Sequence, residues 1–337
     1  MKISIKVKIF LAVIIVILLI TLGYLLLGSA PKQDDIIWGV NFSQMGAESL
    51  KLDWKKTYLA LMDDLGVKNI KLITNWNFVE GDKKGDDFFD DIDWQIRQAE
   101  IRNVKLIYVL GIKTGRWPEC HDPKWARQLS VKDEQAELLK YLEKVVLRYK
   151  GSKAITAWQV ENEPLFNFGE CPWYDKKFLK QEIALVKSLD DSRQIISSDS
   201  GEQSSWFNIA SVADKVGATM YRKVWFHIND TVGFYVDSPF PPVYYYHKAQ
   251  IIKSVFGKEV ICVELQAEPW ASKLFYDIPL AEQEKTMNLK QFNSNIEFAK
   301  KTGLKEFYLW GAEWWYWLKQ DQNRPEIWNQ AKLLFRK

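Results

Sequence analysis

The chain has 337 residues, 47% apolar and 26% charged, a composition that excludes a disordered or fibrous protein. Its formal charge of +3 is small for this length, and the sequence has no basic stripe after the N-terminal lysines, so nucleic acid is not an expected partner. We expect one α/β barrel, a fold that commonly uses about 250 residues, behind an N-terminal segment.

The N-terminal segment is the clearest local feature. Residues 9–28 carry no charge and follow Lys2, Lys6 and Lys8. A helix of this length crosses roughly 30 Å of hydrocarbon, and the positive-inside rule keeps the lysines in the cytoplasm. The expected division is a cytoplasmic basic tail over 1–8, a transmembrane signal-anchor helix over 9–28, a linker over 29–35 and an extracytoplasmic barrel over 36–337.

A cleaved signal peptide is the alternative interpretation of the same segment, because Gly28, Ser29 and Ala30 are small residues of the kind found at cleavage sites. The anchor is favoured because a signal peptide's apolar region usually has about 7–15 residues, and because Pro31 directly follows the candidate site. Both interpretations export the domain, which would be secreted if the segment were cleaved.

From residue 36 onward, short β-branched and aromatic runs alternate with longer segments of helical period, which is typical of repeated βα units. Strands are expected over 36–42, 69–74, 105–111, 155–161, 194–198, 216–221, 259–264 and 306–311. Helices are expected over 54–65, 88–102, 132–148, 176–189, 243–256, 282–302 and 324–335. Eight such units predict a closed (β/α)8 TIM barrel. Residues 223–242, which are aromatic and proline-rich, are expected to form a long loop that is functional or partly ordered.

The active site of such a barrel lies at the C-terminal ends of the strands. Polar and aromatic residues concentrate at these expected ends: Asn41, Asn75, Trp76, Lys113, Glu161, Asn162, Glu163, Asp199, Glu202, Tyr221, Arg222, Glu264, Gln266, Trp310, Glu313 and Trp314. On this ground Asn75, Trp76 and Lys113 are candidate substrate-binding residues.

The fourth strand ends in Asn162-Glu163-Pro164. This motif resembles the acid/base motif of the cellulase-like clan of retaining β-glycosidases (clan A, family-five-like), the (β/α)8 group that includes cellulases, β-mannanases and β-glucosidases. The resemblance implies that Glu163 is the general acid/base and that Asn162 binds the sugar 2-hydroxyl. It covers residues 36–337, although only the two strand-end glutamate segments are specific.

The same clan carries its nucleophile at the end of the seventh strand, where the apolar run Val260–Val263 leads to Glu264. Glu264 is therefore the expected nucleophile. The clan's pattern continues with Phe-Gly or Tyr-Gly, whereas this chain continues with Leu265-Gln266-Ala267, so Glu268 stays open as a competitor.

Further substrate contacts follow from the resemblance. Tyr221, at the end of the sixth strand, matches a tyrosine that hydrogen-bonds the nucleophile, although packing in the barrel is an alternative role. Trp310 and Trp314 match the strand-end tryptophan that floors the first sugar subsite. The chain departs from the clan in carrying Lys71 where many members have an arginine, and Lys113 near the position of a usual histidine.

Three cysteines are present in a domain expected outside the cytoplasm. Cys120 and Cys171 lie in polar, proline-marked segments, whereas Cys262 lies in an apolar run. These positions predict a Cys120–Cys171 disulfide and a buried, free Cys262; three unpaired thiols are the alternative.

The expected reaction needs two carboxylates, one to protonate the leaving oxygen and one to attack the sugar carbon. A gap of about 5–5.5 Å between them gives retention, and the resemblance implies this short distance. The alternatives are an inactive carbohydrate-binding barrel and a metal-dependent hydrolase. For the latter, His121, His227 and His247 have no paired ligand spacing. No metal or cofactor is expected, and the expected substrate is a β-linked oligo- or polysaccharide of unspecified sugar and linkage.

Overall fold

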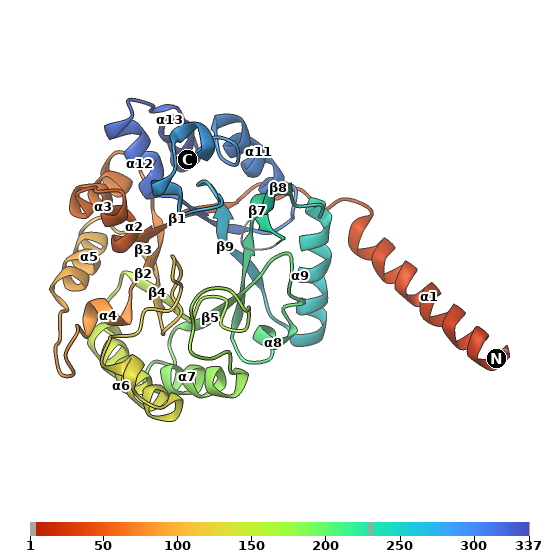
Figure 1. Cartoon of the computed structure of the whole chain (residues 1–337), viewed down its shortest axis with the longest axis horizontal. Helices are drawn as coiled ribbons and strands as arrows, with labels where there is room; N and C mark the ends of the chain where they lie inside the picture. Colours follow the sequence, from red (N-terminus) through yellow and green to blue (C-terminus); the bar gives the residue numbers. More distant parts are fainter. Residues whose placement is uncertain (1–4, 229–231, 337) are drawn as a thin grey trace.

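The computed structural model describes residues 5–228 and 232–336 and contains a closed barrel of eight parallel strands. Around the barrel the order is β1-β10-β9-β6-β5-β4-β3-β2, so the first and last strands close it (Figure 1). The strands are β1 (Ile37–Ser43), β2 (Asn69–Ile73), β3 (Lys105–Leu110), β4 (Ile155–Val160), β5 (Gln194–Asp199), β6 (Lys215–Met220), β9 (Val260–Gln266) and β10 (Glu306–Trp310). The predicted (β/α)8 TIM barrel is confirmed.

Helices form the outer ring of the barrel (Figure 1). Those longer than one turn are α2 (Gln44–Ser49), α3 (Trp54–Asp63), α5 (Asp90–Ile101), α6 (Val131–Tyr149), α7 (Lys176–Leu189), α9 (Pro242–Phe256), α11 (Leu289–Lys300), α12 (Ala312–Asp321) and α13 (Glu326–Phe335). Short turns are α4 (Trp76–Val79), α8 (Phe207–Ala210), α10 (Leu280–Gln283), η1 (Ala126–Gln128) and η2 (Phe275–Asp277). Helix starts are capped where short polar side chains allow it: the Ser130 hydroxyl accepts from the Asp133 amide.

Three expected elements differ from the structure. The helix expected over 282–302 is divided into α10 and α11, because Asn288 caps a new helix by accepting from the Gln291 amide. The segment 223–242 contains an antiparallel hairpin, β7 (Lys223–His227) with β8 (Gly233–Asp237), instead of an irregular loop; its residues 229–231 lie outside the described residues. After β10 the chain turns into α12, which the sequence analysis did not expect.

The core of the described residues has three parts, of which the smallest consists of Ile73, Val109 and Trp310. Inside the barrel a small cluster fills the interior; its members are Ile107, Ala157, Ile196, Ile261, Val263 and Tyr308. A much larger cluster packs the outer faces of the strands against the helices. Inside, β1 approaches β10 closely: a Cβ at Gly39 would lie 2.6 Å from the Tyr308 ring, so this position requires glycine.

Helix α1 (Ile5–Leu26) projects away from the barrel (Figure 1). Its residues Lys6–Leu26 are long and apolar enough to cross a membrane, and none of them is buried. At its C-terminal end, Tyr24 stacks on His247 of α9 with ring centroids 4.3 Å apart. Of the predicted tail over residues 1–8, residues 1–4 lie outside the described residues, and the rest belongs to α1.

The disulfide Cys120–Cys171 joins the segment after β3 to the segment after β4. Cys262 is free and buried in β9. Both cysteine predictions are confirmed. The disulfide lies at the strand ends that carry the polar residues described next, so it bears directly on the site.

Candidate active site

Glu163 lies just beyond β4 in a constrained backbone conformation, with φ of 47°. Its amide donates to Ser198 Oγ at 2.9 Å, and one carboxyl oxygen accepts from Thr219 Oγ1 at 2.9 Å. Only 8% of the residue is exposed. Burial, and next the charge of Glu264, raise the pKa of Glu163 to about 8. This carboxyl group is therefore protonated at neutral pH.

Glu264, in β9, is 2% exposed and both its oxygens accept hydrogen bonds. Oε1 accepts from Lys71 Nζ at 2.8 Å, and Oε2 accepts from the Tyr221 hydroxyl at 2.7 Å. Burial, then the charge of Glu264, raise the pKa of Tyr221 well above its usual range, so its hydroxyl stays a donor. The cation and the phenol hold a negative carboxylate in place.

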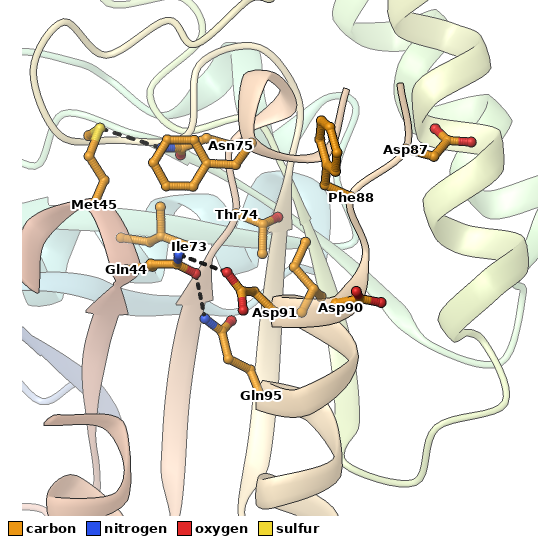
Figure 2. Close-up of a pocket in the computed structure, with 12 residues that line it drawn as sticks. Gln44, Met45, Ile73, Thr74, Asn75, Asp87, Phe88, Asp90, Asp91 and Gln95 are labelled. Carbon is orange, nitrogen blue, oxygen red and sulfur yellow. Dashed lines mark hydrogen bonds between the residues drawn. The ribbon is translucent and has the colours of Figure 1, made fainter. Parts of the chain in front are cut away.

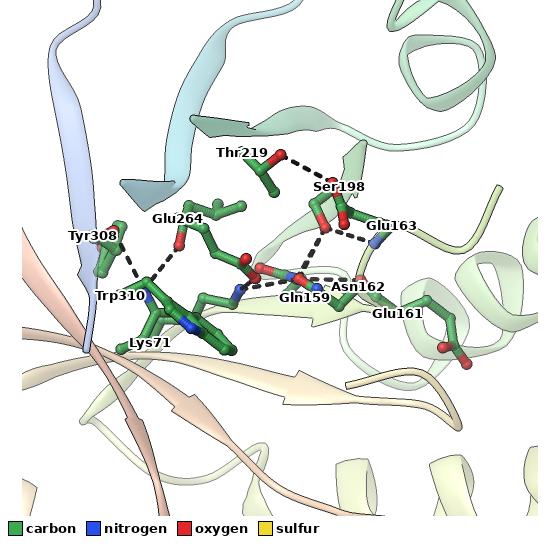
Figure 3. A network of polar contacts seen from close by, with 12 residues as sticks. Lys71, Gln159, Glu161, Asn162, Glu163, Ser198, Thr219, Glu264, Tyr308 and Trp310 are labelled. Atoms are coloured by element: carbon green, nitrogen blue, oxygen red, sulfur yellow. Dashed lines mark hydrogen bonds and ion pairs between the residues drawn. The ribbon is translucent and has the colours of Figure 1, made fainter. Parts of the chain in front are cut away.

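Asn162 connects the two glutamates (Figure 3). Its Oδ1 accepts from Lys71 Nζ at 3.0 Å, from Gln159 Nε2 at 3.0 Å and from Ser198 Oγ at 3.1 Å. Because a lysine can only donate, these contacts fix which atom of the Asn162 amide is the oxygen. No described acceptor takes a hydrogen bond from Nδ2, so this donor remains for a ligand.

Thr219 brings the two carboxyl groups to one place. It bonds Glu163, and in the ladder between β6 and β9 its Cα is the register partner of Glu264. Thr219 is therefore a neighbour of both glutamates, and their catalytic roles stay a prediction.

Lys113 holds the backbone that carries Glu163. Its Nζ donates to the carbonyls of Glu163 at 3.0 Å and Phe166 at 2.8 Å. Its amide and that of Ile112 donate to the Glu161 carboxylate at 2.6 and 2.8 Å. Lys113 thus binds protein carbonyls around the site, and the segments after β3 and β4 are clamped together.

Trp310 lies at the end of β10 with 6% exposure, beneath a cationic side chain. The Arg116 guanidinium carbon is 4.5 Å from the centroid of its ring, and Arg116 pairs with Glu268 and with Glu313, the latter at 3.0 Å. The indole Nε1 donates to Glu268 Oε1 at 2.7 Å. Burial raises the pKa of Glu268 to about 7 although Arg116 opposes this. Glu268 is thus engaged in an ion-pair network.

Two expected residues do not reach the carboxylates. Trp76 is fully buried and donates to Glu80 at 3.0 Å. Trp314 is 1% exposed and donates to Gln283 at 2.7 Å, because it belongs to α12 and not to a longer β10. Both indoles pack in the protein, and we do not retain them as sugar contacts.

A cavity of about 490 Å³ lies beside the site, between the ends of β1 and β2 and the start of α5 (Figure 2). Its lining combines amides, acids and aromatic rings: Gln44, Met45, Ile73, Thr74, Asn75, Phe78, Asp87, Phe88, Asp90, Asp91, Ile92 and Gln95. Asn75 belongs to this wall, and its Oδ1 accepts from Thr114 at 2.9 Å. Thr114 follows Lys113, so the cavity wall is linked to the clamp on Glu163.

The sequence analysis missed several residues of the site. Lys71 was noted only as a departure from a pattern, yet it is fully buried and binds Glu264; a lysine inside the apolar strand Asn69–Ile73 was the available signal. Arg116 and Thr219 had no comparable signal, because their partners lie 152 and 56 residues away along the chain.

No protein-family model matches the chain, and no curated protein matches it by sequence. Solved structures match its fold. An endoxylanase of glycoside hydrolase family 10 from a sugarcane soil metagenome is 15% identical, with 91% of this chain and 98% of that chain covered and a TM-score of 0.58. Xylanase 10B from Thermotoga maritima is 15% identical, with 89% and 95% covered and a TM-score of 0.58. A GH5_18 protein from Streptomyces cattleya, solved with GlcNAc, is 10% identical, with 84% and 71% covered and a TM-score of 0.56.

Proposed function

We propose that the chain is a retaining glycoside hydrolase in which Glu163 is the general acid/base and Glu264 the nucleophile. One observation carries the proposal: two buried glutamates meet at the barrel mouth in unlike environments. Glu264 accepts from a cation and a phenol, whereas burial and the charge of Glu264 raise the pKa of Glu163 to about 8. An acid held neutral beside a charged carboxylate is the pairing that glycoside hydrolysis requires.

The reaction follows in two balanced steps. Glu163 gives its proton to the leaving oxygen while Glu264 attacks the sugar carbon, so the glycosidic bond breaks and a glycosyl–Glu264 ester forms. Glu163, now ionised, takes a proton from water as that water attacks the same carbon. The ester breaks, and Glu264 returns as a carboxylate beside Lys71.

Supporting roles follow from the contacts. Tyr221 and Lys71 orient Glu264, and the Nδ2 group of Asn162 binds the sugar 2-hydroxyl. Lys113 keeps Glu163 in position through the carbonyls of Glu163 and Phe166. Trp310 can stack against a sugar ring only in a conformation in which the Arg116 guanidinium no longer covers the face of its indole.

The substrate class is a β-linked glycan longer than one unit. The solved proteins of similar fold include xylanases and a β-galactosidase, so the fold alone does not select a sugar. The 490 Å³ cavity offers planar amides beside exposed Phe78 and Phe88, a combination suited to pyranose rings. We assign it to the sugars that precede the reacting unit.

We place the enzyme outside the cytoplasm, anchored by α1. The apolar stretch Lys6–Leu26 suits a membrane span, and the disulfide suits an oxidising compartment. The division into tail, anchor, linker and barrel given above stays part of this proposal.

A second candidate function is a carbohydrate-binding barrel without turnover. The limited access to the proposed catalytic centre favours it, because Arg116 covers the Trp310 ring and Glu264 is only 2% exposed. It predicts glycan binding that survives replacement of both glutamates.

The test is a turnover screen of the full chain in detergent against aryl β-glycosides and β-linked polysaccharides. Glu163→Gln and Glu264→Gln should each abolish cleavage, while Glu268→Gln and the exposed-site control Glu170→Gln should retain it. Loss of cleavage in Glu268→Gln with retention in Glu264→Gln would transfer the nucleophile role to Glu268. Binding without turnover in every protein would support the second candidate.

A further inference from the structure

A further buried glutamate, Glu119, lies in the segment between β3 and α6, directly before the disulfide residue Cys120. Glu119 is 8% exposed, and none of the described side chains donates a hydrogen bond to its carboxylate or pairs with it. Its carboxyl oxygens are not among the buried side-chain atoms that lack a partner, so they keep contact with solvent and are open to a ligand. Neither the acid/base nor the nucleophile role uses this residue.

The charges that act on the Glu119 carboxyl group belong to residues of the active site. Burial raises the pKa of Glu119 to about 7, with Lys113, Glu264 and Lys71 acting on its charge in that order. Glu119 in turn contributes to raising the pKa of Glu163. The geometry agrees: Cys120, the residue after Glu119, forms a β-bridge with Lys113, whose Nζ binds the carbonyls of Glu163 and Phe166.

The backbone around Glu119 is fixed by several contacts. The Thr114 amide donates to the Glu119 carbonyl at 3.1 Å, and an isolated bridge pairs Lys113 with Cys120. Cys120 is bonded to Cys171. Glu119 itself has φ of 79°, a conformation that is unfavourable for a non-glycine residue and is retained where the surroundings impose it.

The same contacts place Glu119 against the segment that carries Glu163. The Glu170 amide donates to the Pro118 carbonyl at 3.0 Å, and a Cβ at Gly169 would lie only 2.5 Å from the Glu119 Cβ. The side chain therefore packs on the segment after β4. Glu163, on the same segment, must face the leaving oxygen, so the leaving-group side of the scissile bond is the side that we assign to Glu119.

We propose that Glu119 is a substrate-binding residue whose carboxylate accepts hydrogen bonds from a hydroxyl pair of the leaving-group sugar, and that the Cys120–Cys171 disulfide positions it. The proposal rests on the glycosidase function proposed above and names a contact of that site. A neutral hydroxyl pair fits better than an ammonium group, because the positive charges of Lys113, Lys71 and Arg116 already act on this carboxyl group and lower its pKa.

Aromatic rings near Glu119 offer an apolar surface to the same sugar. Trp117, two residues earlier, is 44% exposed and packs edge-on against Phe168 at 6.1 Å. Phe168 continues to Trp270 at 5.5 Å, and Trp270 contacts Tyr221 at 4.9 Å. A sugar held by Glu119 would lie beside this row, with its apolar face available for ring contacts.

The experiment measures binding and turnover separately on the full chain in detergent. Binding of xylohexaose, cellohexaose, mannohexaose and a glucosamine hexamer is measured by calorimetry in the inactive Glu163→Gln background. Adding Glu119→Gln should weaken binding of the neutral hexasaccharide at least 5-fold, whereas adding Glu170→Gln should change it less than 2-fold. Tighter binding of the glucosamine hexamer than of every neutral probe would overturn the hydroxyl assignment.

Measurements of turnover then test whether Glu119 acts on the leaving-group side of the scissile bond. In the otherwise unchanged chain, Glu119→Gln should lower kcat/KM at least 10-fold on the hexasaccharide and less than 2-fold on a dinitrophenyl glycoside, which has no leaving-group sugar. Equal losses on both substrates, or no loss on either, would overturn the proposal. If no protein turns over but Glu119→Gln still weakens binding, the glycosidase function fails while the contact stands.

A third experiment tests the disulfide, with Cys120→Ser/Cys171→Ser introduced in the Glu163→Gln background. This protein should reproduce the loss of hexasaccharide affinity while keeping native circular dichroism. Unchanged affinity would overturn the positioning role of the disulfide. If the double variant does not fold, the comparison of Glu119→Gln with Glu170→Gln still decides the binding role. Failure of Glu163→Gln to bind any hexasaccharide would overturn both proposals.

Discussion

The ammonium group of Lys71 lies 2.8 Å from Oε1 of Glu264, and the exposed fractions of the two side chains are 0% and 3%. Removing one partner of such a pair leaves a buried, unpaired charge, which costs about 3–5 kcal/mol. We therefore predict that Lys71→Met lowers the free energy of unfolding by about 3 kcal/mol and kcat/KM at least 100-fold. Chemical denaturation and steady-state kinetics measure the two effects. Full activity in a destabilised protein would show that Lys71 serves folding alone.

Tyr221 supplies the second hydrogen bond to Glu264, at 2.7 Å. The change Tyr221→Phe removes only the hydroxyl, so the free energy of unfolding should fall by about 1 kcal/mol. We expect kcat to fall 10-fold or more, because the nucleophile loses one of the donors that orient it. Phe226→Leu, an exposed change on the hairpin, is the control. Unchanged kcat in Tyr221→Phe would assign this tyrosine to packing.

The protonation of Glu163 should appear in the pH dependence of stability. Its pKa is about 8 in the folded chain against 4.5 as the ordinary value, so its contribution to stability is complete below pH 4.5 and is lost as pH rises toward 8. Glu163→Gln removes this loss. The variant should be more stable than the parent at pH 7, by on the order of 3 kcal/mol, and no more stable at pH 4. Thermal melts at both pH values test this, and equal gains at both would contradict it.

The disulfide closes a loop between cysteines 51 positions apart. A cross-link over such a loop typically contributes about 2–4 kcal/mol, mainly by restricting the unfolded chain. Cys120→Ser/Cys171→Ser should therefore lower the free energy of unfolding by that amount. A second variant tests the pairing itself. Because Cys262 is the free cysteine, the Cys262→Ala protein should contain no titratable thiol in its native state. A reactive thiol in the native, unreduced Cys262→Ala protein would contradict the pairing.

Local patterns in the sequence were sufficient for the barrel. Each strand is a short apolar run, and in each long helix apolar residues recur with the helical period. The (β/α)8 fold and the positions of Glu163 and Glu264 at strand ends could therefore be predicted. The cysteine pairing also followed, because the two bonded residues lie in polar segments and Cys262 lies in an apolar one.

The remaining features depend on contacts distant in sequence. The turn after β10 is set by Gly311, where a Cβ would meet Glu268, and this places Trp314 on a helix. Arg116 covers Trp310 through partners contributed by the segments after β9 and β10. The segment that forms the hairpin of β7 and β8 was predicted to be a loop because it is long, aromatic and proline-rich.

Azide rescue of the two alanine variants tests the central assignment most directly. On an aryl β-glycoside that the parent chain hydrolyses, Glu264→Ala with azide should release a glycosyl azide of inverted configuration, because azide replaces the nucleophile on the opposite face. Glu163→Ala with azide should release one of retained configuration, because azide then attacks the glycosyl–Glu264 ester. Nuclear magnetic resonance of the products distinguishes the two. The same configuration from both variants, or rescue of Glu268→Ala in place of Glu264→Ala, would contradict the assignment of Glu163 and Glu264.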